Sequence, residues 1–542
     1  RVWVKNTGEV AGKDVVQVYY NPPYTQGGIE KASANLVTFA KTKLLQPGES
    51  QVLTMTFLAQ DMASFDWNDA NENDFKGYEL EEGDYEISIR RNSHDVVDSI
   101  TRTIEETIMC TTDTTSGKEI KPLFTGEDGL EAYKSTNDSL EQNMITREGG
   151  LKLPAPISEE DKIYTQEEVD SFGYWTSDYA ATSDNAEQLW NVTELPEGWT
   201  QAESHAEGYT DVTTKLWQMA GISYQNPTIV DGKVVVGTDE GSQKWEAFMN
   251  QLTYEEMKTL LSNGFFKTVA LESIGKPQST DSDGPNQLKA GYENQSAPGG
   301  TFFVSEVVVA STFNLDLAEQ MGIMVGNDSI FMGVSGWYGP SMNIHRSPFA
   351  GRNFEYYSQD GVHSGMMAAA VIKGANSKGV KCYIKHFFLN DQETNRTNSG
   401  LQWADEQTMR EQYAKPFEIA VKEGGTTAIM ASGCTIGGVK VYANYAACEL
   451  LLRNEWDYKG LVLTDWINSS REWSKLMLRS GVDLGLGTGW GPGLSAAEGT
   501  WEDGKVMVNG SESMTTYYHV RKACQRLLYA SANCNQNGRP QE

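Results

Sequence analysis

Charged side chains follow four short apolar runs in the second half of the chain. Asp283 follows one run, Arg352 another, Lys385 and His386 a third, and Asp465 a fourth. Carboxylates can act as nucleophiles or proton carriers, and a nearby cation keeps such a carboxylate ionised. If the four runs are strands of one parallel sheet, these groups meet at its carboxyl edge. The pattern therefore predicts one shared site.

Aromatic residues are interleaved with these charges, namely Trp466, Phe387 and Phe354. Fixed hydrogen-bond donors and acceptors beside aromatic faces suit a neutral sugar ring, whose hydroxyls need polar partners and whose C–H face needs an apolar platform. Trp466 could instead belong to the core.

Each charged residue also has an ordinary structural explanation. Asp283 precedes Gly-Pro and could close a turn, and Arg352 could pair with Glu355 three residues later. Lys385 with His386 could form a buried ion-pair element, and Asp465 could cap a helix starting near Ser469. Each signal is weak alone, whereas four signals at strand ends favour a site.

The elements that would position these residues begin near residue 243. Thr253 and Glu256 form a capping box, and Asn314 can cap a helix with Leu317, Met321 and Met324 on one face. Strand-like runs occur at residues 303–309, 380–384, 427–430 and 461–463. Alternating helices and buried strands predict a (β/α)8 TIM-like barrel over residues 243–535.

Residues 1–105 have a different pattern. Val15 to Tyr20 is β-branched and aromatic, while Tyr85, Ile87 and Ile89 alternate with polar residues. Turn signals between such runs predict an all-β sandwich. We expect this sandwich to be truncated, because its first strand starts at residue 1. Residues 106–242 have weak periodicity and are predicted to be a connector packed on neighbouring domains.

Composition limits the class of protein. The chain has 542 residues, enough for two or three domains, and a net charge of −30, which disfavours nucleic acid and anionic membranes as partners. No apolar run is long enough for a membrane helix. The six cysteines form no CxxC pair, so we expect no zinc cluster, and a disulfide between Cys524 and Cys534 stays open. We also expect no other metal and no cofactor.

Several motifs together resemble glycoside hydrolase family 3, the β-glucosidase family. They are Ser282-Asp283-Gly284-Pro285, residues 343–348 leading into Gly351-Arg352-Asn353-Phe354-Glu355, Lys385-His386-Phe387 with residues 390–396, and Leu463-Thr464-Asp465-Trp466. Asn6-Thr7-Gly8 and residues 45–49 likewise resemble the fibronectin type III-like domain of that family.

The resemblance implies a retaining, exo-acting β-glycosidase, most simply a β-glucosidase acting on a β-glucoside or oligosaccharide. It implies that Asp465 is the nucleophile, that Asp283, Arg352, Lys385 and His386 bind sugar hydroxyls, and that Trp466 forms an aromatic wall. β-Xylosidase activity stays open, as does a carbohydrate-binding or scaffold component without activity.

Two features depart from the family pattern. The fibronectin-like domain precedes the barrel, as in the circularly permuted branch, and the α/β sandwich domain that supplies the acid/base Glu is missing. We therefore expect an upstream α/β domain or companion polypeptide and assign no acid/base residue. Gly433 stands where the family often has an aromatic residue. A homo-oligomer stays open, and composition leans towards an extracytoplasmic, bacterial-like protein.

Overall fold

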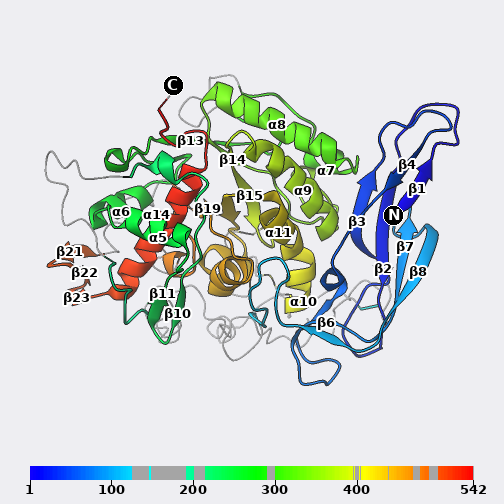
Figure 1. Cartoon of the computed structure of the whole chain (residues 1–542), viewed down its shortest axis with the longest axis horizontal. Helices are drawn as coiled ribbons and strands as arrows, with labels where there is room; N and C mark the ends of the chain where they lie inside the picture. Colours follow the sequence, from blue (N-terminus) through cyan, green and yellow to red (C-terminus); the bar gives the residue numbers. More distant parts are fainter. Residues whose placement is uncertain are drawn as a thin grey trace.

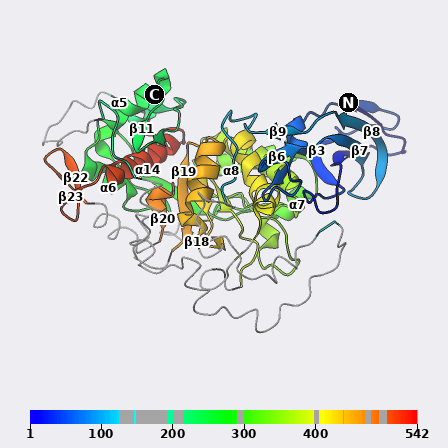
Figure 2. The same ribbon diagram turned by 90° about the horizontal axis from the view of Figure 1, so that it is seen from below.

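The computed structural model describes residues 1–124, 146–147, 191–199, 214–289, 299–394, 396, 402, 404–436, 439–467, 477–487 and 499–540. A β-structure formed by the first part of the chain lies at one end of the molecule, and the helices and remaining strands form the larger body beside it (Figure 1). The same division is seen after a quarter turn (Figure 2).

The N-terminal part is an antiparallel β-sandwich with its own core. Its main sheet has the order β3-β2-β7-β8, and the core gathers Val18, Tyr20, Val37, Leu80 and Tyr85. The strands are β1 (Val2–Lys5), β2 (Val15–Asn21), β3 (Asn35–Lys41), β4 (Ser50–Leu53), β5 (Ser64–Asp66), β6 (Gly77–Leu80), β7 (Gly83–Arg90), β8 (Val96–Ile104) and β9 (Ile108–Cys110). Strand β9 pairs with β6, so the sandwich continues past residue 105.

The larger part contains a seven-stranded sheet with the order β12-β13-β14-β15-β16-β19-β20. Strand β12 is antiparallel to β13, and all the later neighbours in the sheet are parallel. The strands are β12 (Lys267–Thr268), β13 (Ser279–Asp283), β14 (Gly336–Tyr338), β15 (Lys381–Phe387), β16 (Ala428–Ala431), β19 (Leu461–Trp466) and β20 (Leu484–Leu486).

Helices alternate with these parallel strands, as expected for an α/β fold. The α-helices are α5 (Glu240–Met249), α6 (Tyr254–Leu261), α7 (Glu306–Ala310), α8 (Leu315–Met332), α9 (Gly361–Asn376), α10 (Glu406–Thr408), α11 (Lys415–Ile419) and α14 (Met514–Ala532). Wider π-helical turns are η7 (Met409–Ala414), η8 (Ala420–Gly424) and η10 (Ala446–Glu455). Short 3-10 turns are η1 (Ala59–Met62), η3 (Leu216–Met219), η4 (Glu272–Ile274), η6 (Asn353–Glu355) and η9 (Val441–Ala443).

Small hairpins complete the described structure. They are formed by β10 (Thr228–Val230) with β11 (Lys233–Val235), β17 (Thr435–Ile436) with β18 (Val439–Lys440), and β21 (Thr500–Glu502) with β22 (Lys505–Val508) and β23 (Ser511–Glu512).

Local sequence signals are confirmed at several helix starts and strands. Thr253 and Glu256 form the predicted capping box of α6, and the side chain of Asn314 caps α8. The runs predicted at residues 380–384, 427–430 and 461–463 are β15, β16 and β19.

One prediction about the region around α7 and α8 is wrong. Residues 303–309 are not a strand, because Ser305 and Glu306 start the short helix α7 within that apolar run. On α8, Met321 is buried but Leu317 and Met324 are exposed. The buried face instead uses small residues such as Ala318 and Gly322, which allow α9 to approach closely.

The β-sandwich also packs against the α/β part. Phe39 of β3 contacts the rings of Phe313 and His363 edge-on, with centroids 5.1 and 5.4 Å away. In the described part of the predicted connector, Leu123 and Phe124 enter the large α/β core. None of the six cysteines forms a disulfide, and the Cys524 thiol donates to the Met257 carbonyl.

Candidate active site

Predicted site residues lie at or near the carboxyl ends of the parallel strands. Asp283 is the last residue of β13, and Lys385 lies near the end of β15, two strands away in the sheet. The Lys385 ammonium donates to Asp283 Oδ1 at 3.0 Å. Lys385 is buried, so its charge is held in place between Asp283 and Glu355, whose Oε2 lies 3.9 Å away.

Arg352 lies in the segment after β14, directly before the 3-10 turn η6. Its Nε is bonded to Glu355 Oε1, and its Nη2 donates to His386 Nε2 at 3.1 Å. The predicted internal pair between Arg352 and Glu355 is therefore present. Glu355 also accepts a hydrogen bond from Ser341 Oγ at 3.0 Å. This second contact holds the Glu355 carboxylate in place, and the carboxylate in turn orients the Arg352 guanidinium.

The hydrogen-bond pattern defines the protonation of His386. A guanidinium only donates, so Nε2 is the acceptor and the ring proton is on Nδ1, which faces the Tyr356 hydroxyl at 3.4 Å. Burial, together with the charges of Arg352 and Lys385, lowers the pKa of His386 well below its ordinary value. The imidazole is therefore neutral, and both of its nitrogens already face protein groups.

Asp465 is at the end of β19, with little of its side chain exposed. Its Oδ2 accepts a hydrogen bond from Arg396 Nη1 at 2.9 Å, and its Oδ1 accepts one from the Trp466 backbone N–H at 2.7 Å. Gly433 lies beside it, because a Cβ placed there would be 3.8 Å from Asp465 Oδ2. The helix-cap alternative for Asp465 involves residues 468–476, which lie outside the described part of the chain.

Two residues that were not predicted connect Asp465 to the other four. Arg396 binds Glu393 as well as Asp465, with Nε 3.0 Å from Glu393 Oε2. The other oxygen of Glu393 lies 3.5 Å from Arg352 Nη1. A continuous set of ion pairs therefore runs from Asp283 to Asp465. The motif at residues 390–396 contained the signal for these two residues, since Glu393 and Arg396 are three apart.

Trp466 is 40% exposed beside Asp465, and its ring meets Phe265 edge-on at 5.5 Å. Phe354, in η6, is also exposed, whereas Phe387 is fully buried. Phe387 is therefore a core residue and cannot form an aromatic platform, but Trp466 and Phe354 present aromatic surface to solvent near the charged residues.

Asp283 is strongly held in its ionised form. Burial raises its pKa, but the charges of Lys385 and Lys289 outweigh that effect and hold it at about 2. Asp283 Oδ1 also accepts the Gly284 backbone N–H at 2.8 Å, so the same oxygen takes part in the ion pair with Lys385 and in a local backbone contact. A permanent carboxylate at this edge can accept hydrogen bonds from ligand hydroxyls.

Among the described residues, no three His, Cys, Asp or Glu side chains gather in a way that could hold a metal ion. The arrangement instead offers carboxylates and cations, which can bind hydroxyls, stabilise charge or form a covalent bond at Asp465.

The described protein combines two parts. One is a parallel α/β domain with a site of charged residues at the ends of its strands, and the other is a fibronectin-like β-sandwich attached to it. Comparison with known families agrees with that description. Residues 286–500 match the glycosyl hydrolase family 3 N-terminal domain, and residues 14–93 match the fibronectin type III-like domain. The α/β part of the chain is thus similar to the N-terminal domain of glycoside hydrolase family 3.

Known relatives extend over most of this chain. Beta-glucosidase A of Butyrivibrio fibrisolvens is 28% identical over 493 residues, covering 90% of this chain and 53% of that protein. A beta-glucosidase of Ruminococcus albus is 31% identical over 471 residues, covering 85% and 42%. The solved structure of a beta-glucosidase from Paenibacillus barengoltzii matches 99% of this chain and 53% of that chain, with a TM-score of 0.69 and 25% identity. The chain thus spans about half the length of these relatives.

Proposed function

We propose that the chain carries the nucleophile and the sugar-binding half of a retaining β-glucosidase that removes terminal β-glucosyl units. The observation that carries this proposal is Asp465, a carboxylate near the end of β19 that pairs with Arg396 and is joined to Asp283, Lys385 and Arg352 by a continuous set of ion pairs. The relatives named above, all beta-glucosidases, support the choice of sugar.

In this proposal Asp465 attacks the anomeric carbon and forms a glycosyl-enzyme as the leaving-group oxygen departs. A protonated carboxylic acid must supply a proton to that oxygen and later activate the water that releases the sugar. We assign that residue to a part of the whole protein that is not in this chain. Arg396 Nη1 donates to Asp465 Oδ2 at 2.9 Å, which holds the carboxylate in a fixed orientation for the attack.

The remaining residues would orient the sugar. Asp283 accepts hydroxyl hydrogen bonds, and Lys385 and Arg352 donate them. His386 faces Arg352 through Nε2, so it acts first on the orientation of the guanidinium and reaches a hydroxyl only in competition with that contact. Trp466 offers its exposed ring to the apolar face of the substrate.

The complete (β/α)8 barrel is part of the same proposal. Strands β12 and β20 are the two ends of the described sheet order. The segment before β12 nevertheless touches β20, because a Cβ on Gly264 would lie 2.5 Å from Leu484 Cγ and 2.6 Å from the Gly485 carbonyl oxygen. Such an approach of the sheet ends supports closure, which would bring Asp465 and Asp283 to one rim.

The test measures hydrolysis of an activated aryl β-glucoside, whose good leaving group lessens the need for acid assistance. We expect turnover of the glucoside and slower turnover of the matching β-xyloside. A 2-fluoro glucoside should then label the peptide containing Asp465, detected by mass spectrometry. A preference for the xyloside would identify a β-xylosidase, and sugar binding without any label would identify a binding or scaffold component.

A further inference from the structure

A cleft of about 790 Å³ lies between the β-sandwich and the helices of the α/β part. None of Asp283, Arg352, Lys385, His386 and Asp465 lines it. Its wall includes Ile344, His345 and Arg346. These residues begin the segment that leads to Arg352, so one segment of the chain contributes to both the cleft and the proposed active site. Its volume is in the usual range for ligand sites, which often form between domains.

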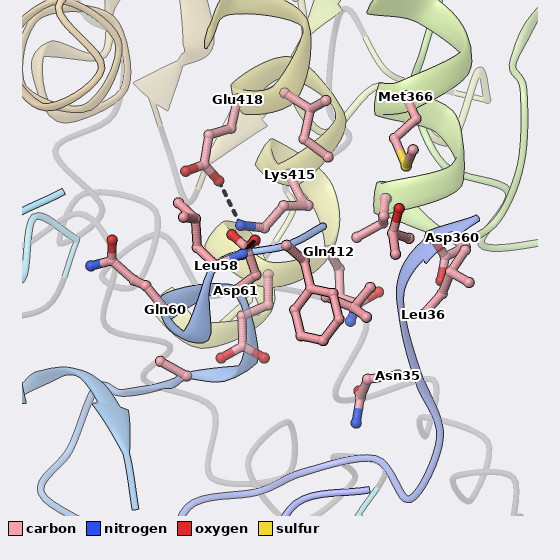
Figure 3. Close-up of a pocket in the computed structure, with 18 of the residues that line it drawn as sticks. Asn35, Leu36, Leu58, Gln60, Asp61, Asp360, Met366, Gln412, Lys415 and Glu418 are labelled. Atoms are coloured by element: carbon pink, nitrogen blue, oxygen red, sulfur yellow. Dashed lines mark hydrogen bonds and ion pairs between the residues drawn. The ribbon is translucent and has the colours of Figure 1, made fainter. Parts of the chain in front are cut away.

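Both parts of the protein contribute to the walls (Figure 3). Leu58, Gln60 and Asp61 come from the sandwich around η1, and Gln412, Lys415 and Glu418 come from η7 and α11. Asp360 and Met366 belong to the start of α9, and Asn35 and Leu36 to β3. A ligand in the cleft would therefore touch both parts at once.

Several polar groups in the cleft have unused hydrogen-bonding capacity. In the described part of the chain, the side chains of Gln359, Gln412 and Tyr413 make no hydrogen bond to protein. Asp61 uses only Oδ2, which accepts the Leu58 backbone N–H at 2.7 Å. Two amides, a phenol and a free carboxylate oxygen are thus available to a ligand with both donors and acceptors.

The cations of the cleft are already engaged. Lys415 pairs with Glu418 at 2.7 Å, Lys422 pairs with Asp113 and Glu418, and Arg346 pairs with Asp391. An anionic ligand would find no unpaired cation among these residues, and it would meet the free oxygen of Asp61. The charges therefore favour a neutral ligand.

Apolar surface lies beside the free polar groups. Leu58 is 47% exposed, and Phe57, Met366 and Ile344 also line the cleft. Planar polar side chains next to apolar surface are what a sugar requires, because each ring has hydroxyls at its edge and C–H groups on its faces. We propose that this cleft is a second saccharide site that binds a neutral β-linked oligosaccharide. The choice of a β-glucan, but not of a neutral saccharide, depends on the proposed function.

The test separates this cleft from the proposed active site. The probe is cellotetraose, titrated by calorimetry into a chain with Asp283→Ala and Asp465→Ala, which lacks turnover and two of the strand-end sugar contacts. We expect saturable binding to remain. Adding Leu58→Arg, which fills the cleft from an exposed position, should weaken binding at least tenfold, and adding Gln412→Ala should weaken it about threefold. Gln320→Ala, on the exposed side of α8, is the matched control and should have no effect.

Three results would overturn the proposal: no saturable cellotetraose binding in the Asp283→Ala/Asp465→Ala chain, unchanged affinity in both Leu58→Arg and Gln412→Ala, or tighter binding of the polyamine spermidine than of cellotetraose. Thermal midpoints of the variants show whether each one folds. Aryl glucoside turnover by the unmodified chain reports the proposed function separately, so an inactive chain that still binds cellotetraose would reject that function and leave the cleft proposal standing.

Discussion

Asp465 has few structural contacts that depend on its charge. Its ion-pair partner Arg396 keeps Glu393 as a second partner, with 3.0 Å between Nε and Oε2. If Asp465 is the nucleophile, Asp465→Ala should lower the rate of aryl glucoside hydrolysis by about 10⁴-fold or more, because the covalent route has no substitute. The free energy of unfolding should change by only about 1 kcal/mol.

Steady-state kinetics and chemical denaturation measure these two quantities. Asp316→Ala, which removes an exposed carboxylate in the first turn of α8, is the control and should leave the rate unchanged. An active Asp465→Ala chain with a 2-fluoro glucoside label on another carboxylate would reject the assignment.

At the scale of elements, the contact between α8 and α9 depends on glycine. A Cβ on Gly374 would lie 2.1 Å from the Glu319 carbonyl oxygen and 2.7 Å from the Ile323 backbone nitrogen. Backbone atoms cannot rotate away, so the helices must separate to admit a methyl group. Gly374→Ala should therefore destabilise the protein by roughly 1–3 kcal/mol, although alanine favours an isolated helix.

The measurement is the urea midpoint of unfolding. Gly12→Ala is the matched control, since nothing lies within 4 Å of a Cβ at that exposed position. A Gly374→Ala chain more stable than the unmodified protein would show that the helices are free to shift.

Between the sandwich and the α/β part, Phe39 is the central aromatic contact, because it is buried against Phe313 and His363. Phe39→Ala should cost roughly 3 kcal/mol or more and should expose the junction to proteases. Calorimetry and limited proteolysis measure both effects. Phe349→Ala, at a side chain that is 92% exposed, should change neither. Equal stability of the two variants would show that the junction contributes little.

For the whole molecule, Glu411 makes stability depend on pH. Its Oε1 accepts the Phe65 backbone N–H at 2.6 Å across the junction, and burial raises its pKa from 4.5 to about 7 despite the nearby Lys415, with Asp405 adding to the rise. Between these values the folded state binds more protons than the unfolded state. This contribution to stability is therefore complete below pH 4.5 and is lost as pH rises through 7, by at most about 3 kcal/mol.

Glu411→Gln removes the titrating group but keeps an acceptor for Phe65. Thermal midpoints at pH 5 and pH 8 should therefore fall less between the two pH values in Glu411→Gln than in the unmodified chain. An identical fall in both proteins would show that Glu411 does not carry the pH dependence.

Local signals in the sequence were sufficient for several elements. Thr253 and Asn314 cap helices because their side chains reach backbone N–H groups only three residues away. The prediction of a strand at residues 303–309 was wrong because an apolar, β-branched run is compatible with either a strand or a buried helix. Only the packing of the run decides between these two structures. Leu317 and Met324 share a helix face with Met321 but are exposed. Helical spacing does not show which of two apolar faces meets a neighbour.

By itself, the sequence determined which residue types stand at the strand ends, since parallel strands bring Asp283, Lys385 and Asp465 to one edge wherever the sheet forms. Only the tertiary structure decided how these residues are joined. Arg396 and Glu393 connect Asp465 to Arg352 through ion pairs, and the cleft beside Leu58 and Gln412 exists because the β-sandwich packs against the α/β part. Contacts between residues far apart in the chain depend on packing, which no local pattern encodes.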